Sequence, residues 1–120
     1  MKIVLDTNAV LYFLGGRLAE PLPDADFYIS VITEIELLSY PSLSNEEETV
    51  ICDFLSDITI IDLNQAIKQS AIELRKQYRF KLPDALIVAT AHSLNATLLT
   101  NDVKLLNIKE ILSQQLLLSF

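Results

Sequence analysis

The segment Lys2-Ile3-Val4-Leu5-Asp6 decides the fold class of this chain. Its aliphatic run stops at an aspartate, as short buried strands of parallel sheets do. Strand patterns recur at 27–30, 58–63 and 97–99, and the tail at 116–120 has the composition of a last edge strand. Helical patterns separate the strand patterns. This alternation predicts an α/β fold with right-handed crossovers and a mainly parallel sheet covered by helices on both faces.

The expected helices have clear start and stop signals. The first helix should end at Gly15-Gly16, because glycine readily adopts a left-handed conformation. Ser30 is suited to cap the second helix, and Ser44 with Glu47 three residues later matches a capping box for the third. Pro83 fits the first turn of the last helix. These signals predict helices that directly follow the strands.

The composition predicts one compact domain over residues 1–120. Of the 120 residues, 51% are hydrophobic, and only two are glycine and four proline, so a single packed core is expected. The formal net charge of −7 excludes a general nucleic-acid binder, which carries a basic excess. Affinity for phosphate must then be local or supplied by a metal ion. The hydrophobic surplus of so small a domain predicts a homodimer.

The cysteine content indicates the compartment. Cys52 is the only cysteine and lies close to Ile51 and Phe54, so we expect a buried free thiol in a reducing environment and a cytoplasmic protein. No apolar run approaches the roughly 20 residues of a membrane span, so we expect no membrane contact.

Acidic residues stand where strands end and helices begin. Asp6 and Asp102 follow two of the expected strands, so both should open onto the same edge of the sheet. Asp84 falls in the first turn of its helix, where the helix dipole favours an ionised carboxylate. Any one of these acids alone is equally well explained as a helix starter or loop residue. Converging carboxylates, however, repel one another, and hard cations such as Mg²⁺ or Mn²⁺ relieve that repulsion.

A glutamate from the second helix is a further candidate. Glu34 and Glu36 are two residues apart and project to different sides of the helix, so only one can face the site. The apolar centre of the helix falls about midway between them, and periodicity therefore does not choose.

Four short segments together resemble the PIN domain family. They are Asp6-Thr7-Asn8, the run from Ile29 to Thr33 that leads to Glu36-Leu37, Leu82-Pro83-Asp84-Ala85, and Leu99-Thr100-Asn101-Asp102. Within that family the chain looks most like the short VapC-type toxins of type II toxin–antitoxin pairs, which are Mg²⁺- or Mn²⁺-dependent ribonucleases. The resemblance runs nearly end to end and becomes weakest after Asp102.

The resemblance implies a fold, a site and partners. The fold would be a three-layer α/β/α sandwich around a mainly parallel sheet of four to five strands. The resemblance selects Glu36 over Glu34, and one or two Mg²⁺ or Mn²⁺ ions would be held by Asp6, Glu36, Asp84 and Asp102. Thr7, Asn8 and Thr100 would orient these acids, as polar groups around metal ligands usually do. The partners would be an RNA substrate and a protein antitoxin.

Positive charge gathers at the end of the long helix expected at 64–78 and just after it. Arg75, Lys76, Arg79 and Lys81 form a basic group that could guide an RNA backbone toward the acids. Basic residues also suit a solvated helix C-terminus, which is the commoner explanation. Tyr78 and Phe80 could stack on bases, although aromatic residues more often pack in the core.

Two other functions fit parts of the pattern. A receiver-type signalling domain would use Asp62 as its phospho-acceptor, but it needs two acids after the first strand and a lysine after the last. Here Thr7 and Asn8 follow Asp6, and no lysine follows Leu116. The other alternative is a catalytically inactive PIN-like module that binds a partner or RNA.

Overall fold

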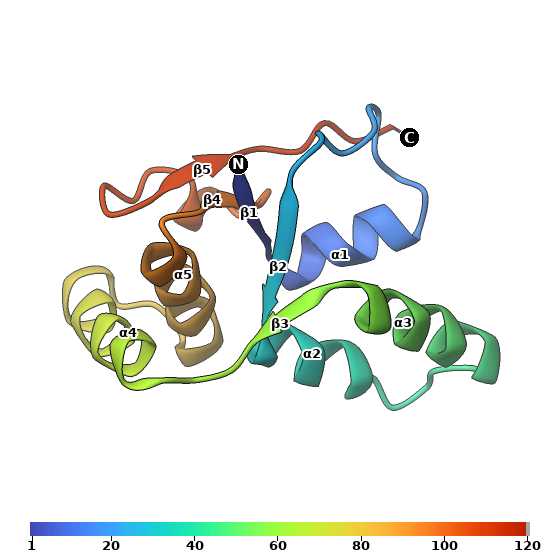
Figure 1. Cartoon of the computed structure of the whole chain (residues 1–120), viewed down its shortest axis with the longest axis horizontal. Helices are drawn as coiled ribbons and strands as arrows, with labels where there is room; N and C mark the ends of the chain where they lie inside the picture. The colour runs from blue at the N-terminus through green and yellow to red at the C-terminus, as the bar shows by residue number, and fades with distance from the viewer. Residues whose placement is uncertain (120) are drawn as a thin grey trace.

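The computed structural model describes residues 1–119 as one α/β unit, drawn in Figure 1. Its strands are β1 (Lys2–Leu5), β2 (Asp26–Ser30), β3 (Thr59–Ile61), β4 (Thr97–Leu99) and β5 (Leu112–Gln114). Its α-helices are α1 (Thr7–Leu14), α2 (Val31–Leu38), α3 (Asn45–Asp57), α4 (Gln65–Tyr78) and α5 (Leu82–Leu94), and a short 3₁₀ helix, η1, spans Val103–Leu105.

The strands form one parallel sheet in the order β3-β2-β1-β4-β5. The central strand β1 pairs on one side with β2, Val4 opposite Tyr28, and on the other with β4, Val4 opposite Leu98. The chain first builds the sheet outward from β1 through β2 to β3, and then returns to the other side of β1 with β4 and β5. In open α/β sheets, ligands bind outside the carboxyl ends of the two strands that flank such a reversal. Here these strands are β1 and β4, which lead into Asp6 and Asp102, and we refer to this place as the crevice.

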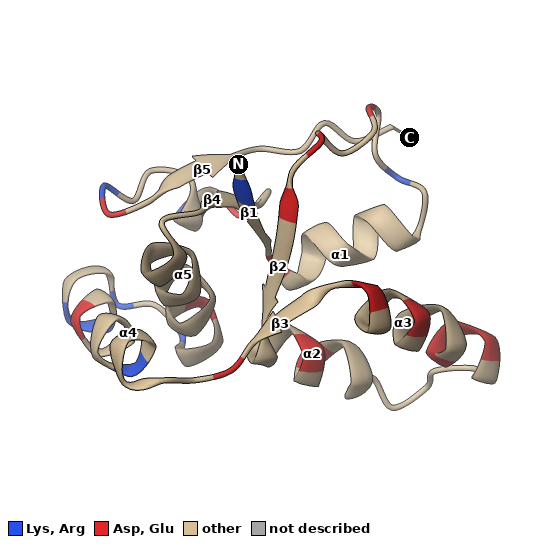
Figure 2. Cartoon of the chain, in the orientation of Figure 1, with Lys and Arg blue, Asp and Glu red and all other residues tan. Residues whose placement is uncertain are grey.

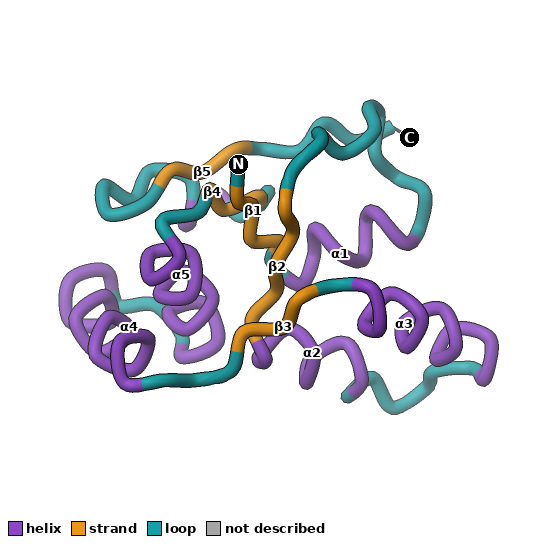
Figure 3. Tube along the Cα trace, viewed as in Figure 1, coloured by secondary structure: helices purple, strands orange, loops and turns teal. Residues whose placement is uncertain are grey.

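Alternation along β1 divides the core into two layers. Ile3 and Leu5 pack in one apolar cluster with residues of α1 and α3, whereas Val4 packs in the other with residues of α4 and α5. Figures 1 and 3 show the strands running between these two groups of helices. The expected three-layer sandwich with a parallel sheet is therefore confirmed.

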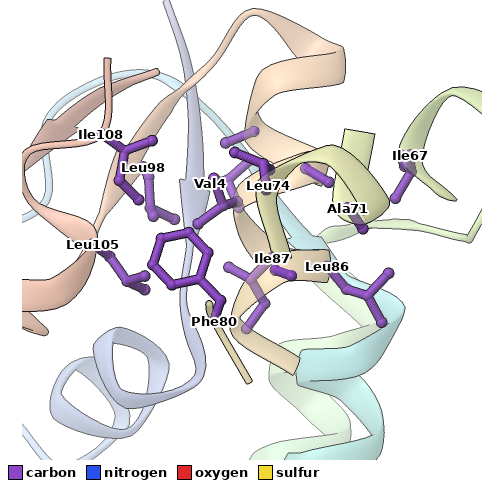
Figure 4. Packing of buried hydrophobic residues seen from close by; sticks show 14 of the residues in the cluster. Val4, Ile67, Ala71, Leu74, Phe80, Leu86, Ile87, Leu98, Leu105 and Ile108 are labelled. Carbon is purple, nitrogen blue, oxygen red and sulfur yellow. The ribbon is translucent and has the colours of Figure 1, made fainter. Parts of the chain in front are cut away.

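The α4–α5 layer packs closely because the middle of α5 is buried on all sides. Every residue from Ala85 to Ala91 is buried. Figure 4 shows Val4 and Leu98 of the sheet together with Leu105 and the ring of Phe80 in this cluster. Close packing on α5 holds its N-terminus, and with it Asp84, at a fixed place beside the sheet.

The helix ends agree with the sequence signals. The hydroxyl of Ser30 accepts a hydrogen bond from the amide of Ile32, and Ser44 and Glu47 form both hydrogen bonds of a capping box. Gly16 has φ of +67°, the left-handed conformation expected at the end of the first helix. Pro83 lies in the first turn of α5.

The expected edge strand at 116–120 was placed wrongly. The strand that pairs with β4 is β5, Leu112–Gln114, and within the described residues Leu118 forms only an isolated antiparallel bridge with Leu18. Phe120 lies outside the described residues. The leucine-rich tail has the composition of a strand, but hydrogen bonds to the loop before β2 draw it away from the parallel sheet: Ala19 N–H donates to Leu117 O, and Ser119 N–H donates to Arg17 O.

The expected burial of Cys52 was also wrong, because its side chain is exposed. Ile51 is the buried residue of α3, and the next residue along a helix is turned by about 100° toward solvent. Among residues 1–119, no helix is long and apolar enough to cross a membrane.

Candidate active site

Asp6 occupies a buried place at the carboxyl end of β1. It is the N-cap of α1, and its Oδ1 accepts a hydrogen bond of 2.7 Å from the amide of Ala9. Its Oδ2 accepts a hydrogen bond from the hydroxyl of Thr100, the residue after β4. The side chain is thus fixed by both strands that border the crevice. Only 6% of Asp6 is exposed.

The pKa of Asp6 depends on its burial, its hydrogen bonds and its acidic neighbours. Burial raises the pKa of Asp6 most, the hydrogen bonds from Thr100 and Ala9 lower it, and the charges of Asp102 and Asp84 raise it further. The pKa of Asp6 lies above its ordinary value, so burial and repulsion outweigh the two hydrogen bonds.

Thr100 connects Asp6 to Asp102. While its hydroxyl donates to Asp6, the same oxygen accepts a hydrogen bond of 3.0 Å from the amide of Asp102. Oδ1 of Asp102 in turn accepts a hydrogen bond of 3.0 Å from the amide of Lys104 and caps η1. Both acids are therefore oriented by hydrogen bonds among residues that follow the ends of β1 and β4.

Asp84 enters the same neighbourhood from the first turn of α5. Desolvation raises the pKa of Asp84 most, and the charges of Asp102 and Glu36 raise it further, while Lys104 and Lys81 lower it. The helix dipole favours the ionised form, but burial and like charges prevail over it. Through these interactions Asp84 is linked to acids from two other elements.

Glu36 approaches from α2, which contacts α1 and α3 on one side and α5 on the other. Its Oε1 accepts a hydrogen bond of 2.6 Å from the hydroxyl of Thr7 at the start of α1. Its charge also raises the pKa of Asp84. Glu34 has neither of these contacts within residues 1–119. The structure thus places Glu36, not Glu34, beside the other acids.

The four side chains have the donor chemistry of a site for a hard divalent cation. All supply carboxylate oxygens, which Mg²⁺ and Mn²⁺ prefer, and a carboxylate oxygen that accepts one hydrogen bond still has a second lone pair. No group of three or more His, Cys, Asp or Glu side chains in residues 1–119 is arranged to hold a metal ion as it stands. The acids share one electrostatic neighbourhood, in which Asp6, Asp102 and Glu36 accept hydrogen bonds from protein groups. The residues fit the ion in the chemistry of their oxygen atoms.

A model of the PIN domain family matches residues 3–111. The chain belongs to the PIN domain family. This result confirms the resemblance drawn from the four short segments. PIN domains are nucleases, so the acids lie on the scaffold of a nuclease family.

Solved structures of toxin–antitoxin complexes contain chains similar to this PIN domain. A chain of a complex from Klebsiella pneumoniae is 30% identical, with 92% of this chain and 95% of that chain covered and a TM-score of 0.74. A chain of VapBC-1 from nontypeable Haemophilus influenzae is 27% identical, with 96% and 98% covered and a TM-score of 0.75. VapBC2 from Rickettsia felis, bound to a DNA fragment from its promoter, shares the fold at 24% identity and a TM-score of 0.80, with 96% and 98% covered. A search of curated proteins found no match.

The strand order of this PIN domain excludes a receiver-type signalling domain. That fold has the order 2-1-3-4-5, with its third strand beside the first, whereas β3 here is an edge strand next to β2. Asp62 after β3 is two strands away from β1, about 10 Å by the usual strand spacing. It is exposed, and its Oδ1 accepts a hydrogen bond from the amide of Leu63.

The residues of the basic group, Arg75, Lys76, Arg79 and Lys81, differ in the contacts that they make. Figure 2 shows that the charged residues of α3 are all acidic, whereas Lys and Arg gather on α4 and just after it. Nε of Arg75 donates to the carbonyl of Phe80, and Lys76 lies 3.8 Å from Glu73 on the surface. Arg79 ends α4 in a left-handed conformation. Lys81 lowers the pKa of Asp84 and is the member of the group with a direct electrostatic effect on the acids.

The aromatic residues of this region pack on each other. The rings of Tyr78 and Phe80 are stacked with centroids 5.2 Å apart, and Phe80 is buried. The hydroxyl of Tyr78 donates to Glu110 at 2.6 Å. Both rings are thus used in the fold, as the commoner explanation predicted. His92 is exposed, with its ring 3.0 Å from the carbonyl of Glu110, outside the acidic neighbourhood.

The polar residues expected to support the acids divide into two kinds. Thr7 and Thr100 contact Glu36 and Asp6 directly. Asn8 is exposed, and it makes no hydrogen bond to the acids within the described part of the chain, so its supporting role stays a prediction.

Sequence reasoning missed three residues near the site. Lys104 lowers the pKa of Asp84. The amide oxygen of Asn101 accepts a hydrogen bond of 2.7 Å from the backbone of Leu116 and ties the tail to the site loop. Thr33 is fully buried with its hydroxyl 3.1 Å from that of Thr7. Only Thr33 had a usable signal, because a residue three positions before Glu36 shares its helix face.

Proposed function

We propose that this PIN domain is a divalent-metal-dependent endoribonuclease and the toxin of a toxin–antitoxin pair. The observation that carries the proposal is that Asp6 and Asp102, which follow β1 and β4, are connected through Thr100, and that Asp84 and Glu36 belong to the same electrostatic neighbourhood. Membership of a nuclease family and the similarity to chains of toxin–antitoxin complexes support it.

In this proposal the acids divide the chemistry between them. Asp6, Asp84 and Asp102 would hold one or two Mg²⁺ or Mn²⁺ ions, directly or through water. When bound, the ion would supply charge that polarises a phosphodiester oxygen and lowers the pKa of water to near neutral. Glu36 would ligate a second ion or orient the nucleophilic water. Thr7 and Thr100 hold Glu36 and Asp6 in place, and Lys104 and Lys81 offset the negative charge beside Asp84.

The substrate in this proposal is single-stranded RNA. The net charge of −7 gives the whole domain no general attraction for phosphate, so binding depends on the metal ions and on local basic groups. Arg75, Lys76, Arg79 and Lys81 are exposed in the last turn of α4 and the segment that leads to α5, and in this proposal they meet the RNA backbone. Their role is guidance of the strand toward Asp84 rather than recognition of bases.

The proposed protein partner is an antitoxin. A groove of about 640 Å³ runs between α1 and α3 and is lined by apolar residues, among them Leu14 and Val50, with Glu46 and Glu47 at its rim. An amphipathic helix with basic flanks would match this surface. The expected homodimer and the cytoplasmic location belong to the same proposal. Exposed apolar side chains, such as Leu112 and Leu117 in the C-terminal segment, support a self-association surface.

Cleavage of RNA by the purified protein, freed of any partner, tests the proposed activity. We expect cleavage of single-stranded RNA with Mg²⁺ or Mn²⁺, and none with EDTA. Asp84→Asn should abolish cleavage while circular dichroism and the unfolding curve remain those of a folded domain. Asp62→Asn is the matched control, because Asp62 follows another strand at the same edge and lies outside the acidic neighbourhood.

Cleavage by Asp84→Asn at the wild-type rate would contradict this assignment of the site. A wild-type protein that binds RNA or an antitoxin without cleaving would support the inactive PIN-like module instead.

A further inference from the structure

The hydroxyl of Thr33 is a buried polar group in a helix that carries a proposed catalytic residue. Thr33 is 0% exposed, and it lies one turn before Glu36 on the same face of α2. Its Oγ1 lies 3.1 Å from Oγ1 of Thr7, and this is the hydrogen bond found for its side chain within residues 1–119. A buried hydroxyl needs a partner, and here that partner is the residue that contacts Glu36.

The number of hydroxyl protons decides which threonine donates in this contact. Thr7 has one hydroxyl proton and two neighbouring oxygens, Oε1 of Glu36 at 2.6 Å and Oγ1 of Thr33 at 3.1 Å. An ionised carboxylate can only accept, and its hydrogen bonds are the shorter and stronger ones. Thr7 therefore donates to Glu36, and its lone pair accepts the proton of Thr33. The three groups form a one-way chain from Thr33 through Thr7 to Glu36.

We propose that Thr33 is a positioning residue for this PIN domain, acting through Thr7 to fix the carboxylate of Glu36 toward the other acids. The inference deepens the proposed ribonuclease function and rests on it. Glutamate has three rotatable side-chain bonds and is poorly fixed by its own backbone, so its orientation depends on such partners. The hydrogen bond from Thr33 holds the hydroxyl of Thr7 in the rotamer that meets Glu36. The chain thus connects the interior of α2 with the crevice.

Three variants separate positioning from packing. Thr33→Val keeps the side-chain shape and removes the hydroxyl, whereas Thr33→Ser keeps the hydroxyl and removes a methyl group. Thr90→Val is the matched control, because Thr90 is also 0% exposed and its hydroxyl donates to the carbonyl of Leu86 inside α5. A loss of activity caused only by removing a buried hydroxyl would appear in both Thr33→Val and Thr90→Val.

The first measurement is cleavage of single-stranded RNA with saturating Mn²⁺. We expect Thr33→Val to lower kcat about tenfold, the lower end of what partners of metal-site residues contribute, with KM for RNA within about twofold of wild type. Thr33→Ser should restore most of the lost kcat, and Thr90→Val should keep the wild-type value. Active wild type with unchanged kcat in Thr33→Val would overturn the inference and leave the proposed function standing.

The second measurement needs neither metal nor activity. Urea unfolding of metal-free wild type, Thr33→Val, Glu36→Ala and the double variant forms a double-mutant cycle. We expect the effect of Thr33→Val on the unfolding equilibrium constant to differ by about threefold or more between the wild-type and Glu36→Ala backgrounds. Additive effects would overturn the hydrogen-bonded chain. An inactive wild type would overturn the proposed function and with it the positioning role of Thr33 in catalysis, whatever this cycle gives.

Discussion

At the residue scale, the fold brings acidic side chains close together although their negative charges repel one another. Asp6 and Asp84 both have a pKa above the ordinary value, with burial as the first cause and neighbouring acids as a further cause. A domain selected for stability alone would place neutral groups there. The cost is understandable if a cation completes the site.

The charge of Asp84 should therefore destabilise the metal-free protein near neutral pH. Because the pKa of Asp84 is raised above its ordinary value of 3.8 in the folded state, that state holds the proton more tightly, and stability falls as pH rises from 3.8 through the raised value. Asp84→Asn should raise the Tm at pH 7 by a few degrees in EDTA and flatten this part of the pH profile. Calorimetry at pH 4 to 7 measures both effects. A lower Tm in the variant across this range would contradict the account.

Thr100 should matter for stability as well as for the site. Its hydroxyl donates to Asp6 and accepts from the amide of Asp102, and both partners lie in or near the buried crevice. Thr100→Val should cost about 1–3 kcal/mol of unfolding free energy, because it leaves buried polar groups without partners. Thr100→Ser should recover most of that cost. Urea denaturation of metal-free protein gives the comparison, and equal stability of Thr100→Val and wild type would refute it.

At the element scale, most of the fold follows from signals in the sequence. The run of aliphatic residues before Asp6 predicted β1 over its observed span, and Ser30, Ser44 and Pro83 marked helix starts that the structure contains. These features are local, because capping and hydrophobic periodicity depend on neighbours along the chain. Topology then predicted that Asp6 and Asp102 would lie at one edge.

What the sequence could not predict depends on contacts between distant residues. The tail at 116–120 has the apolar content of a strand, yet the strand that pairs with β4 is β5 at Leu112–Gln114, and Leu117 and Ser119 form hydrogen bonds with the distant loop before β2 instead. Helix periodicity could not choose between Glu34 and Glu36, and only the resemblance to the PIN domain family selected Glu36. The contact that distinguishes Glu36 comes from Thr7, 29 positions away. Contacts between side chains of different helices and strands therefore had to be seen in the structure.

The capping box of α3 provides a test at this scale. Ile51 is the only buried residue among those of α3, so its first turn receives little help from packing. Ser44→Ala should destabilise the domain by about 1 kcal/mol, since it removes the acceptor for the amide of Glu47. Thermal unfolding measures the change, and Ser42→Ala in the preceding loop is the matched control. A variant as stable as wild type would mean that α3 does not need its cap.

At the scale of the whole molecule, the acidic crevice and the apolar groove lie on different parts of the protein surface. The crevice lies outside β1 and β4, whereas the groove lies between α1 and α3. Val50→Glu places a charge in the groove, where Val50 is 47% exposed, without touching the acids. It should weaken binding of the cognate antitoxin at least tenfold by calorimetry, while partner-free protein cleaves RNA at the wild-type rate. Unchanged antitoxin affinity would show that the antitoxin does not dock in the groove.

The most direct test of the account is Mn²⁺ binding to purified, partner-free protein, measured by isothermal titration calorimetry. We predict that wild type and Asp62→Asn bind Mn²⁺ alike, and that Asp6→Asn, Asp84→Asn and Asp102→Asn each weaken binding about tenfold or more. Failure of wild type to bind Mn²⁺, or equal binding by all of these variants, would contradict the claim that distant carboxylates meet at one metal site.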